Sequence, residues 1–460
     1  MTEAISATRP EAYPDDCDLH AVPGPSYQSL LDEDRYPVPP HLRLRAPIPE
    51  GLAFEIPRDR YLRADIHDAE VSDMWMRVWQ MACRVDQIPE IGDSILYQVA
   101  DRSYIVVRSD EHTIKAFPNT CLHRGRVLRD RDGKIGWLRC PYHAFTWALD
   151  GSFVGAPAMW DFDQTAEDLR MPEARVDTWG GFVFINPDPD AGPLAEHLGD
   201  IDVHFERCGY TSWSVGLHTG KRVECNWKEI VEGFIESHHV FATHPQAMLG
   251  TDPGNCQYDI WPNLARIILP MGRASESLPD RPTEQRTMNG MMGSIKSRQY
   301  VTVPEGVSAR HHFADLQRAR FAAAGLSTDL SDAEMTDLLV YWIFPNLLIL
   351  GGPRATVMRF LPGRDPHSST IDVMSLNPKP RKAGKPAPPM RWLAEDETFT
   401  GQDDLPGFGL LDQDLSNMPT SHAGMSNLQD RPLILGRYQE ATIAYFHTLL
   451  YDGWLAGRGM

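Results

Sequence analysis

The chain has 460 residues, of which 42% are hydrophobic and 23% charged, a composition typical of a globular protein with a large buried core. Its 44 basic and 63 acidic residues give a formal net charge of −19, which repels nucleic-acid phosphates and anionic lipid headgroups. These properties exclude a disordered, collagen-like or disulfide-stapled miniature chain. We expect neither nucleic acid nor a membrane surface as a partner.

Targeting and redox signals point to a cytoplasmic protein. The longest apolar run, Leu338 to Leu350, is interrupted by Pro345 and Asn346 and is shorter than the ~20 residues that cross a bilayer. The first forty residues contain neither the basic start nor the apolar core of an export signal. The seven cysteines are odd in number and widely scattered, which argues against a disulfide framework. Any paired cysteines are therefore expected to bind metal.

The first part of the chain predicts an arm followed by a β domain. Residues 1–50 are rich in Pro and charge and lack periodicity, which fits either an arm packed over another surface or a partly disordered tail. From Val78 to about Pro187, short alternating or β-branched runs are punctuated by Gly, Asp and Pro. This spacing predicts a compact antiparallel β domain.

Beyond residue 195 the pattern is mixed and predicts an α+β domain. Apolar residues at helical intervals predict three helices, at 226–242, 314–324 and 332–342. Two further segments, 355–361 and 370–376, predict a strand hairpin. The stretch from Pro378 to Met390 is basic and Pro-rich, which indicates an exposed excursion.

The first candidate metal site lies within the predicted β domain. Cys121 and His123 are separated by one residue, and Cys140 and His143 by two. Two soft thiolates and two imidazoles can complete the ligand set of a metal centre. From ligand count alone, a structural Cys₂His₂ zinc site and a coincidental spacing stay open.

The sequence around these four residues resembles the cluster-binding loops of Rieske [2Fe–2S] proteins. The strings are CLHRGRVL and CPYHAFTWALDG. The resemblance implies that Cys121 and Cys140 bind one iron, while His123 and His143 bind the other and face solvent. Replacing two thiolates by neutral imidazoles raises the cluster potential to roughly −150 to +300 mV, which suits an electron relay. Ala144 stands where the family usually has Gly, and we expect ligation to be unaffected.

The second candidate metal site lies in NWKEIVEGFIESHHVFATHP, residues 226–245. His239 and His244 fit the spacing D/E-x-x-H-x4-H, with Glu236 as the acid. A five-residue step turns about 140° around a regular helix, so both imidazoles can meet one metal only where the helix ends or widens. Pro245 is consistent with a helix end near that point. The alternative for each residue is a hydrogen-bonded core histidine.

This segment resembles the iron-binding helix of Rieske non-haem oxygenase α subunits. The resemblance implies a distant carboxylate as the third ligand, for which Asp414 in LLDQDLSNMPTSHAGM is the first choice and Asp412 the second. Two histidines and one carboxylate form a facial triad whose open positions admit dioxygen beside a substrate. Glu236 is implied to bridge His239 to a cluster histidine of the neighbouring subunit. Gly233 replaces the family's usual Asn, so no role of that Asn is carried over.

The resemblance also implies the architecture. We expect an antiparallel β Rieske domain and a helix-grip-like catalytic domain, in which helices cover a curved antiparallel sheet. The expected divisions are an N-terminal arm and lead-in at 1–75, the Rieske domain at 76–190, and the catalytic mononuclear-iron domain at 191–460.

The function implied is that of a terminal oxygenase, which takes electrons from NAD(P)H through a reductase or ferredoxin. We expect dioxygenation of an apolar, aromatic substrate in aromatic hydrocarbon catabolism, with a Rieske monooxygenase or O/N-demethylase as the alternative. A homotrimer is implied, with or without a small β subunit. Rivals from other classes are a Rieske electron carrier fused to a ligand-binding domain and a zinc-stabilised binding protein.

Two surface segments have open interpretations. The run Met288 to Met292 fits either a flexible lid over an apolar cleft or a mobile loop without a role. The basic residues of the Pro-rich excursion fit either a docking site for an acidic ferredoxin or a solvated loop. These residues are Lys379, Arg381, Lys382 and Lys385.

Overall fold

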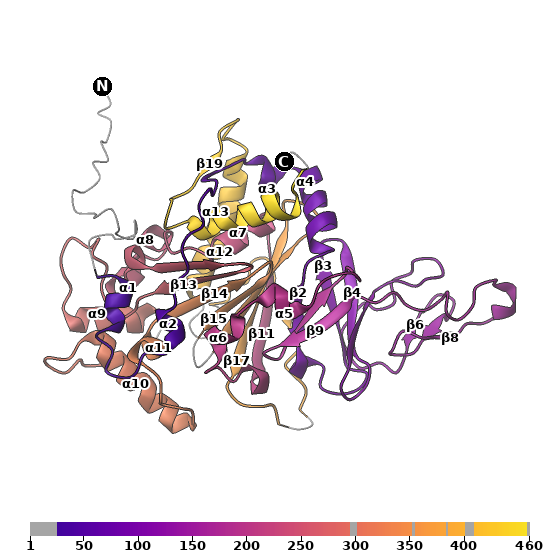
Figure 1. Ribbon diagram of the computed structural model, residues 1–460, viewed down its shortest axis with the longest axis horizontal. Helices are drawn as coiled ribbons and strands as arrows, with labels where there is room; N and C mark the ends of the chain where they lie inside the picture. Colours follow the sequence, from indigo (N-terminus) through magenta and orange to yellow (C-terminus); the bar gives the residue numbers. More distant parts are fainter. Residues whose placement is uncertain (1–24, 295–300, 352–354, 383–384, 401–408, 458–460) are drawn as a thin grey trace.

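The computed structural model describes all residues except 1–24, 295–300, 352–354, 383–384, 401–408 and 458–460 (Figure 1). It confirms an α+β protein with a mixture of helices and antiparallel sheets. A body built on one large sheet occupies most of the molecule, and an arm of small sheets projects from it (Figure 1).

The large sheet has eight strands in the order β12-β13-β14-β15-β16-β17-β11-β18. Neighbouring strands are antiparallel except β18, which runs parallel to β11. The strands are β11 (Ser214–Val223), β12 (Gln257–Trp261), β13 (Leu264–Leu269), β14 (Leu338–Ile343), β15 (Leu347–Gly351), β16 (Thr356–Pro362), β17 (Ser369–Asn377) and β18 (Arg391–Trp392). The predicted hairpin at 355–361 and 370–376 is confirmed as β16 and β17.

Alternation of side chains divides the interior into two cores, one on each face of this sheet. On β14, Val340 and Trp342 join the core that also contains residues of three helices, whereas Leu339 and Tyr341 join the other. The three helices are α7 (Trp227–Glu232), α12 (Gly409–Met425) and α13 (Ala441–His447). Five short helices contribute to the opposite core: α1 (Tyr27–Leu31), α2 (Pro40–Arg43), α5 (Leu194–Leu198), α6 (Ile201–Phe205) and α11 (Asp332–Thr336).

The projecting arm confirms the predicted antiparallel β domain. It contains three three-stranded sheets, β2-β10-β9, β3-β4-β5 and β6-β7-β8. Their strands are β2 (Gln80–Arg84), β3 (Ser94–Val99), β4 (Arg102–Arg108), β5 (Ile114–Pro118), β6 (Leu138–Arg139), β7 (Thr146–Trp147), β8 (Phe153–Gly155), β9 (Arg175–Trp179) and β10 (Phe182–Asn186). The sheet of β6, β7 and β8 lies toward the far end of the arm (Figure 1).

The N-terminal segment from residue 25 to residue 75 packs on the body that contains the large sheet. This is one of the two interpretations expected from the sequence. Tyr27, Leu30 and Leu31 of α1 are almost fully buried, and Arg35 pairs with the buried Asp332 at 3.0 Å. The segment before residue 25 lies outside the described residues. Further lead-in elements are β1 (Glu55–Ile56), which pairs with β19 (Leu433–Ile434), α3 (Asp59–Leu62), α4 (Ala64–Ala69) and a π-helix (Glu70–Trp75).

Two helix predictions in the catalytic body are partly wrong. The segment 332–342 forms a short helix, α11 (Asp332–Thr336), and then strand β14. The apolar run of β14 is buried on both faces, and such a run lacks the alternation that separates strand from helix in a sequence. The segment 226–242 is broken: α7 ends at Glu232, and α8 (Val240–Thr243) follows after an irregular stretch. Helix α10 (Ala309–Ala324) confirms the prediction at 314–324.

The methionine-rich run is neither a lid nor a mobile loop. It lies in helix α9 (Glu284–Ser294), and Met288, Met291 and Met292 are 0%, 1% and 5% exposed. This helix packs against η5 (Pro245–Leu249), the turn that directly follows His244. Helix α9 therefore supports the chain at the second candidate metal site.

The basic excursion is held to the body by two of its cations. Lys379 Nζ donates to the carbonyl of Ala324, and Arg381 Nη2 lies 2.9 Å from Asp86 Oδ2. The side chain of Arg381 is only 17% exposed. The prediction of a solvated excursion is therefore wrong for Arg381, whereas Lys379 is exposed as expected.

The contact between α9 and η5 generates a stability prediction. A Cβ on Gly290 would lie 2.5 Å from Leu249 Cβ and 3.1 Å from the Leu249 carbonyl carbon. We expect Gly290→Ala to lower the free energy of unfolding by about 1–3 kcal/mol, because the backbones must separate. The thermal unfolding midpoints of wild type and Gly290→Ala measure this difference.

The matched control is Gly424→Ala in helix α12, where an added Cβ meets nothing within 4 Å. There the helix propensity of Ala should leave stability unchanged or raise it by up to about 1 kcal/mol. Equal midpoints for wild type and Gly290→Ala would contradict the close packing of α9 on η5.

Candidate metal centres

The first centre is built from two loops with matching backbone hydrogen bonds. The amide of Cys121 donates to the carbonyl of Arg126 at 2.9 Å, and the amide of Cys140 donates to that of Phe145 at 2.8 Å. Both cysteines are buried and reduced. The two loops therefore present their thiols in equivalent positions at the end of the arm.

Each loop turns at a residue in the left-handed region. Gly125 has a φ of 70° and Ala144 a φ of 58°, and their amides donate to the carbonyls of Cys121 and Cys140. The expected substitution of the family's Gly by Ala thus leaves the turn in place. The cost is backbone strain of order 1 kcal/mol, because a Cβ disfavours this conformation.

The two histidines complete the centre. The rings of His123 and His143 lie 4.7 Å apart in an edge-to-face arrangement, and His123 stacks on Phe145. Nδ1 of His123 is buried and has no hydrogen-bond partner among the described residues. Nε2 of His143 lies 2.8 Å from Arg124 Nη2. A buried nitrogen without a partner is the state expected of a residue whose partner is a bound metal group, so the donor set fits a cluster.

The geometry does not fit one zinc ion. A tetrahedral zinc with ligands at 2.0–2.3 Å brings ligand atoms within about 4 Å of one another. Among the described residues, the ligand atoms of His239, His244 and Asp414 all lie within 4.8 Å of one another. The four residues of the first centre do not form such a group.

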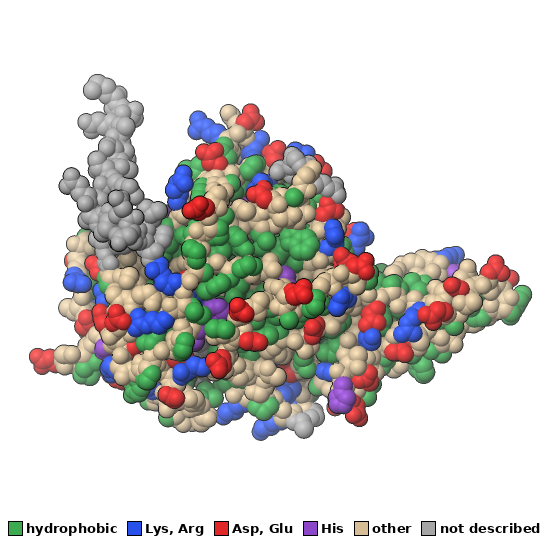
Figure 2. Space-filling model, in the orientation of Figure 1, with side chains coloured by type: hydrophobic (Ala, Val, Ile, Leu, Met, Phe, Trp, Pro, Cys, Tyr) green, Lys and Arg blue, Asp and Glu red, His purple; other side chains and the backbone are tan. Residues whose placement is uncertain are grey.

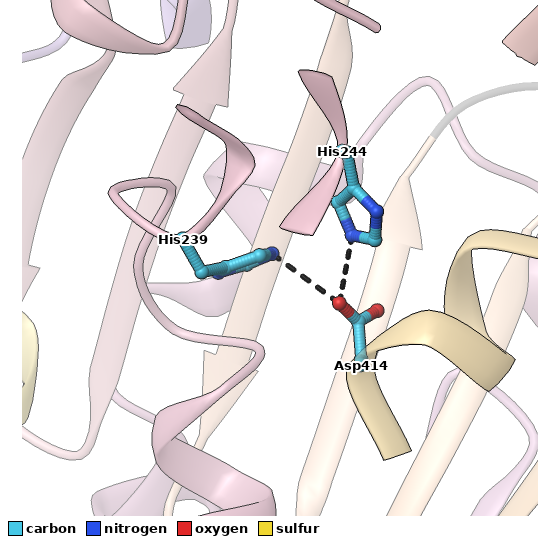
Figure 3. A group of neighbouring side chains, drawn as sticks. All are labelled: His239, His244 and Asp414. Carbon is cyan, nitrogen blue, oxygen red and sulfur yellow. Dashed lines mark hydrogen bonds and ion pairs between the residues drawn. The ribbon is translucent and has the colours of Figure 1, made fainter. Parts of the chain in front are cut away.

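The second centre brings together the three predicted ligands (Figure 3). Nε2 of His244 lies 2.7 Å from Asp414 Oδ1, and Nε2 of His239 lies 3.5 Å from the same oxygen. His239 immediately precedes the short helix α8, and His244 immediately follows it. The end of α8 at Thr243 therefore solves the angular problem of the five-residue spacing, because the backbone of His244 is no longer helical (φ −125°, ψ 51°).

Glu236 orients His239. Its Oε1 lies 2.5 Å from Nδ1 of His239, and its Oε2 accepts the backbone N–H of the same residue at 3.0 Å. Burial, the largest single effect, lowers the pKa of His239, but the hydrogen bond and charge of Glu236 together raise it above the ordinary value. A proton held on Nδ1 leaves Nε2 directed at Asp414.

Asp412, the second choice for the carboxylate ligand, lies elsewhere. It accepts the backbone N–H groups of Phe399 at 2.8 Å and Thr400 at 2.7 Å. Two positions separate it from Asp414 on α12, so its side chain faces a different direction.

The structure also reveals residues that sequence reasoning missed. Gln413 Oε1 lies 2.8 Å from Nδ1 of His244. His422, also on α12, pairs with Glu229 on α7 at 2.6 Å. The only sequence signal for either was proximity to Asp414 along one helix.

Gly233 sits where Met418 Cε would be 2.5 Å from an added Cβ, so Met418 occupies the space that the family's Asn would need.

Comparison with protein families establishes the class. The model of the ring hydroxylating alpha subunit (catalytic domain) family matches residues 202–455, and the Rieske [2Fe-2S] domain model matches residues 78–169. The chain therefore belongs to the ring-hydroxylating α-subunit family of Rieske oxygenases. Its cofactors are a Rieske [2Fe–2S] cluster and a mononuclear iron, which excludes the zinc-stabilised binding protein and the simple electron carrier.

Curated relatives include both mono- and dioxygenases. The chain is 28% identical over 199 residues to the glycine betaine monooxygenase oxygenase subunit of Pseudomonas aeruginosa, covering 43% of this chain and 46% of the relative. It is 27% identical to the carnitine monooxygenase oxygenase subunit of Escherichia coli, covering 42% and 53%. It is 28% identical to the 2-aminobenzenesulfonate 2,3-dioxygenase subunit alpha of an Alcaligenes species, covering 39% and 48%. These matches span about half of each relative.

Solved structures share the fold. The quaternary ammonium Rieske monooxygenase CntA in complex with L-carnitine aligns with a TM-score of 0.63 at 18% identity, covering 88% of this chain and 96% of that one. Naphthalene 1,2-dioxygenase from a Rhodococcus species, bound to indole, aligns with a TM-score of 0.61 at 18% identity, covering 88% and 95%. None of the described helices has the length and apolar character to cross a membrane.

The turn at Ala144 generates a prediction for the first centre. We expect Ala144→Gly to stabilise the loop by about 0.5–1 kcal/mol, because relief of the left-handed strain exceeds the added flexibility of the unfolded chain. The temperature at which the visible absorption of the cluster disappears should rise accordingly.

The reverse substitution at the equivalent position is the control. An added Cβ on Gly125 meets nothing within 4 Å, so Gly125→Ala tests backbone conformation alone and should lower that temperature. A rise for Gly125→Ala, or a fall for Ala144→Gly, would contradict the strain assigned to these turns.

Proposed function

We propose that the chain is the terminal oxygenase of a Rieske monooxygenase system, which inserts one atom of dioxygen into a C–H bond of a small organic substrate. The other oxygen atom leaves as water, and two electrons come from NAD(P)H through a reductase, with or without a ferredoxin. The convergence of His239, His244 and Asp414 carries this proposal. Monooxygenases of quaternary ammonium compounds among the relatives favour it over ring dioxygenation.

Aromatic ring dioxygenation, our expectation from the sequence, is the second candidate. The dioxygenase relative with an aromatic substrate name supports it. The apolar and aromatic nature of the substrate, and a role in aromatic hydrocarbon catabolism, stay predictions. An O/N-demethylase is a form of the first candidate, because hydroxylation of a methyl group next to a heteroatom releases it.

In this proposal the chain's own residues supply geometry and charge. His239, His244 and Asp414 would hold the mononuclear iron. Two neutral imidazoles and one carboxylate reduce the charge of Fe(II) to +1 and leave positions open, and the metal supplies dioxygen activation there. Cys121, Cys140, His123 and His143 would hold the [2Fe–2S] cluster, which stores an electron.

We also propose that electrons pass between neighbouring copies through Glu236. Figure 1 places β6 and β8, next to the cluster loops, at one end of the molecule and α8, next to the iron site, toward the other. Electron transfer within one copy would have to cross most of the molecule. Glu236 already contacts His239, and its side chain is 8% exposed. A cluster histidine of a neighbouring copy would approach it from solvent.

The end of the arm has the surface expected of a contact with another copy. Large hydrophobic side chains are exposed there, and Figure 2 shows hydrophobic atoms at this end of the molecule. They are Trp137, Tyr142, Val154 and Trp160, which are 57%, 60%, 54% and 87% exposed. Exposed apolar groups of this size favour a protein partner. We propose a homotrimer, with a small β subunit as an addition to test.

The lead-in segment is tied to the catalytic domain by a strand pair. We propose a lead-in at 1–75, a Rieske domain at 76–190 and a catalytic domain at 191–460, and a cytoplasmic location. The pairing of β1 with β19 supports assigning the lead-in to the catalytic body, because it ties residues 55–56 to residues 433–434.

The reaction type is tested by product analysis under ¹⁸O₂ with a surrogate reductase. Quaternary ammonium, aromatic and methoxylated compounds are the candidate substrates. One labelled oxygen per product, with the other in water, is the expected result. A cis-diol carrying two labelled oxygens would support ring dioxygenation instead.

The ligand set is tested by iron content. We expect Asp414→Ala to lose the single mononuclear iron and keep both cluster irons with an unchanged visible spectrum, because the two sites lie in different domains. Asp412→Ala is the matched control on the same helix and should keep all iron. Full iron content in Asp414→Ala would contradict the assignment.

The bridge is tested by Glu236→Gln, which keeps the size of the side chain and removes its charge. We expect product formation to fall by about 100-fold while chemical reduction of the cluster proceeds normally, because the carboxylate both orients His239 and links it to the partner copy. Wild-type turnover in this variant would rule out the bridge.

A further inference from the structure

Gln413 lies next to Asp414 on α12 and contacts the iron site from outside. Its Oε1 lies 2.8 Å from Nδ1 of His244 and accepts the side-chain amide of Gln246 at 2.7 Å. Two donors thus converge on one amide oxygen. The two donors lie close together because His244 and Gln246 flank Pro245 at the start of η5.

The hydrogen bond between His244 and Gln413 determines which ring nitrogen of His244 is available to bind a metal. An amide oxygen only accepts hydrogen bonds, so Nδ1 of His244 must carry the proton. The other nitrogen, Nε2, faces Asp414 Oδ1 at 2.7 Å, where the proposed metal would lie. With iron bound, Nε2 would carry no proton, while Nδ1 would keep its proton and donate it to Gln413 Oε1.

Gln246 hydrogen-bonds to the amide of Gln413 and favours one orientation of that amide. If the Gln413 amide were reversed, its NH₂ would face Nδ1 of His244 as a donor and would require the proton on Nε2. That tautomer has no lone pair for a metal. Reversal of Gln413 would require the exposed amide of Gln246 to reverse as well, so the pair favours the accepting orientation.

The two histidines of the centre are therefore held by different groups. Glu236, a carboxylate, holds Nδ1 of His239 at 2.5 Å, whereas Gln413, a neutral amide, holds Nδ1 of His244. An anionic acceptor makes an imidazole a stronger electron donor than a neutral one does. His244 is expected to be the weaker donor of the pair, and its position depends on one amide.

We propose that Gln413 is a positioning residue that holds His244 with its proton on Nδ1 and its Nε2 directed at the iron position. This inference rests on the ligand set proposed above. It assigns no chemistry to Gln413 itself, which touches neither substrate nor metal.

The test uses the intact protein with its Rieske cluster in place and the mononuclear iron removed by a chelator. Ferrous ion is titrated back without oxygen, and nitric oxide is added for EPR of the ferrous–nitrosyl centre. Gln413→Met keeps the length of the side chain and removes the acceptor. We expect ferrous affinity to fall 10–100-fold and the EPR signal to change shape. Gln413→Glu restores an acceptor and should bind ferrous ion at least as tightly as wild type.

Asn417→Ala is the matched control, because Asn417 on the same helix donates to Thr243 at 3.1 Å without touching a proposed ligand. It should leave affinity and EPR unchanged. A loss below threefold in Gln413→Met, a loss that Gln413→Glu does not restore, or an equal loss in Asn417→Ala overturns the proposal. Gln413→Ala replaces the Met variant if that variant does not fold.

The wild-type titration separates the two proposals. If wild type binds no ferrous ion at the emptied site, the ligand set itself is wrong and the role of Gln413 falls with it. If wild type binds ferrous ion and Gln413→Met binds it equally well, the ligand set stands and only the role of Gln413 is overturned.

Discussion

The second metal centre depends on one constraint, which is that the helical turn α8 ends before His244. A continuous helix would turn the imidazoles of His239 and His244 about 140° apart. Helix α8 instead has only four residues and ends at Thr243, and the non-helical backbone of His244 turns its imidazole toward that of His239. Asp414, 170 residues further along the chain, then meets both Nε2 atoms.

Helix α12 holds this broken segment in place along its whole length. Gln413 contacts His244, and His422 contacts Glu229 on α7. Around a regular helix, Gln413 and His422 lie about 100° and about 80° from Asp414, on opposite sides of it. The helix that carries the carboxylate therefore also contacts the His244 segment and α7.

The sequence predicted both sites because their ligands have short, fixed spacings, such as Cys121 to His123 and His239 to His244. The β16–β17 hairpin was also predictable, because a turn-rich segment separates two β-branched runs. Strand β14 was not, since it is apolar on both faces and carries no alternation. Gln413 and His422 were not, because their partners lie 169 and 193 residues away and only packing brings them together.

An anomalous diffraction map at the iron absorption edge tests the central claim most directly. For crystals of the fully loaded protein, the account predicts an isolated peak bounded by His239, His244 and Asp414, separate from the cluster peaks at the Cys121 and Cys140 loops. Cluster peaks alone, with no iron at the three residues, would contradict it.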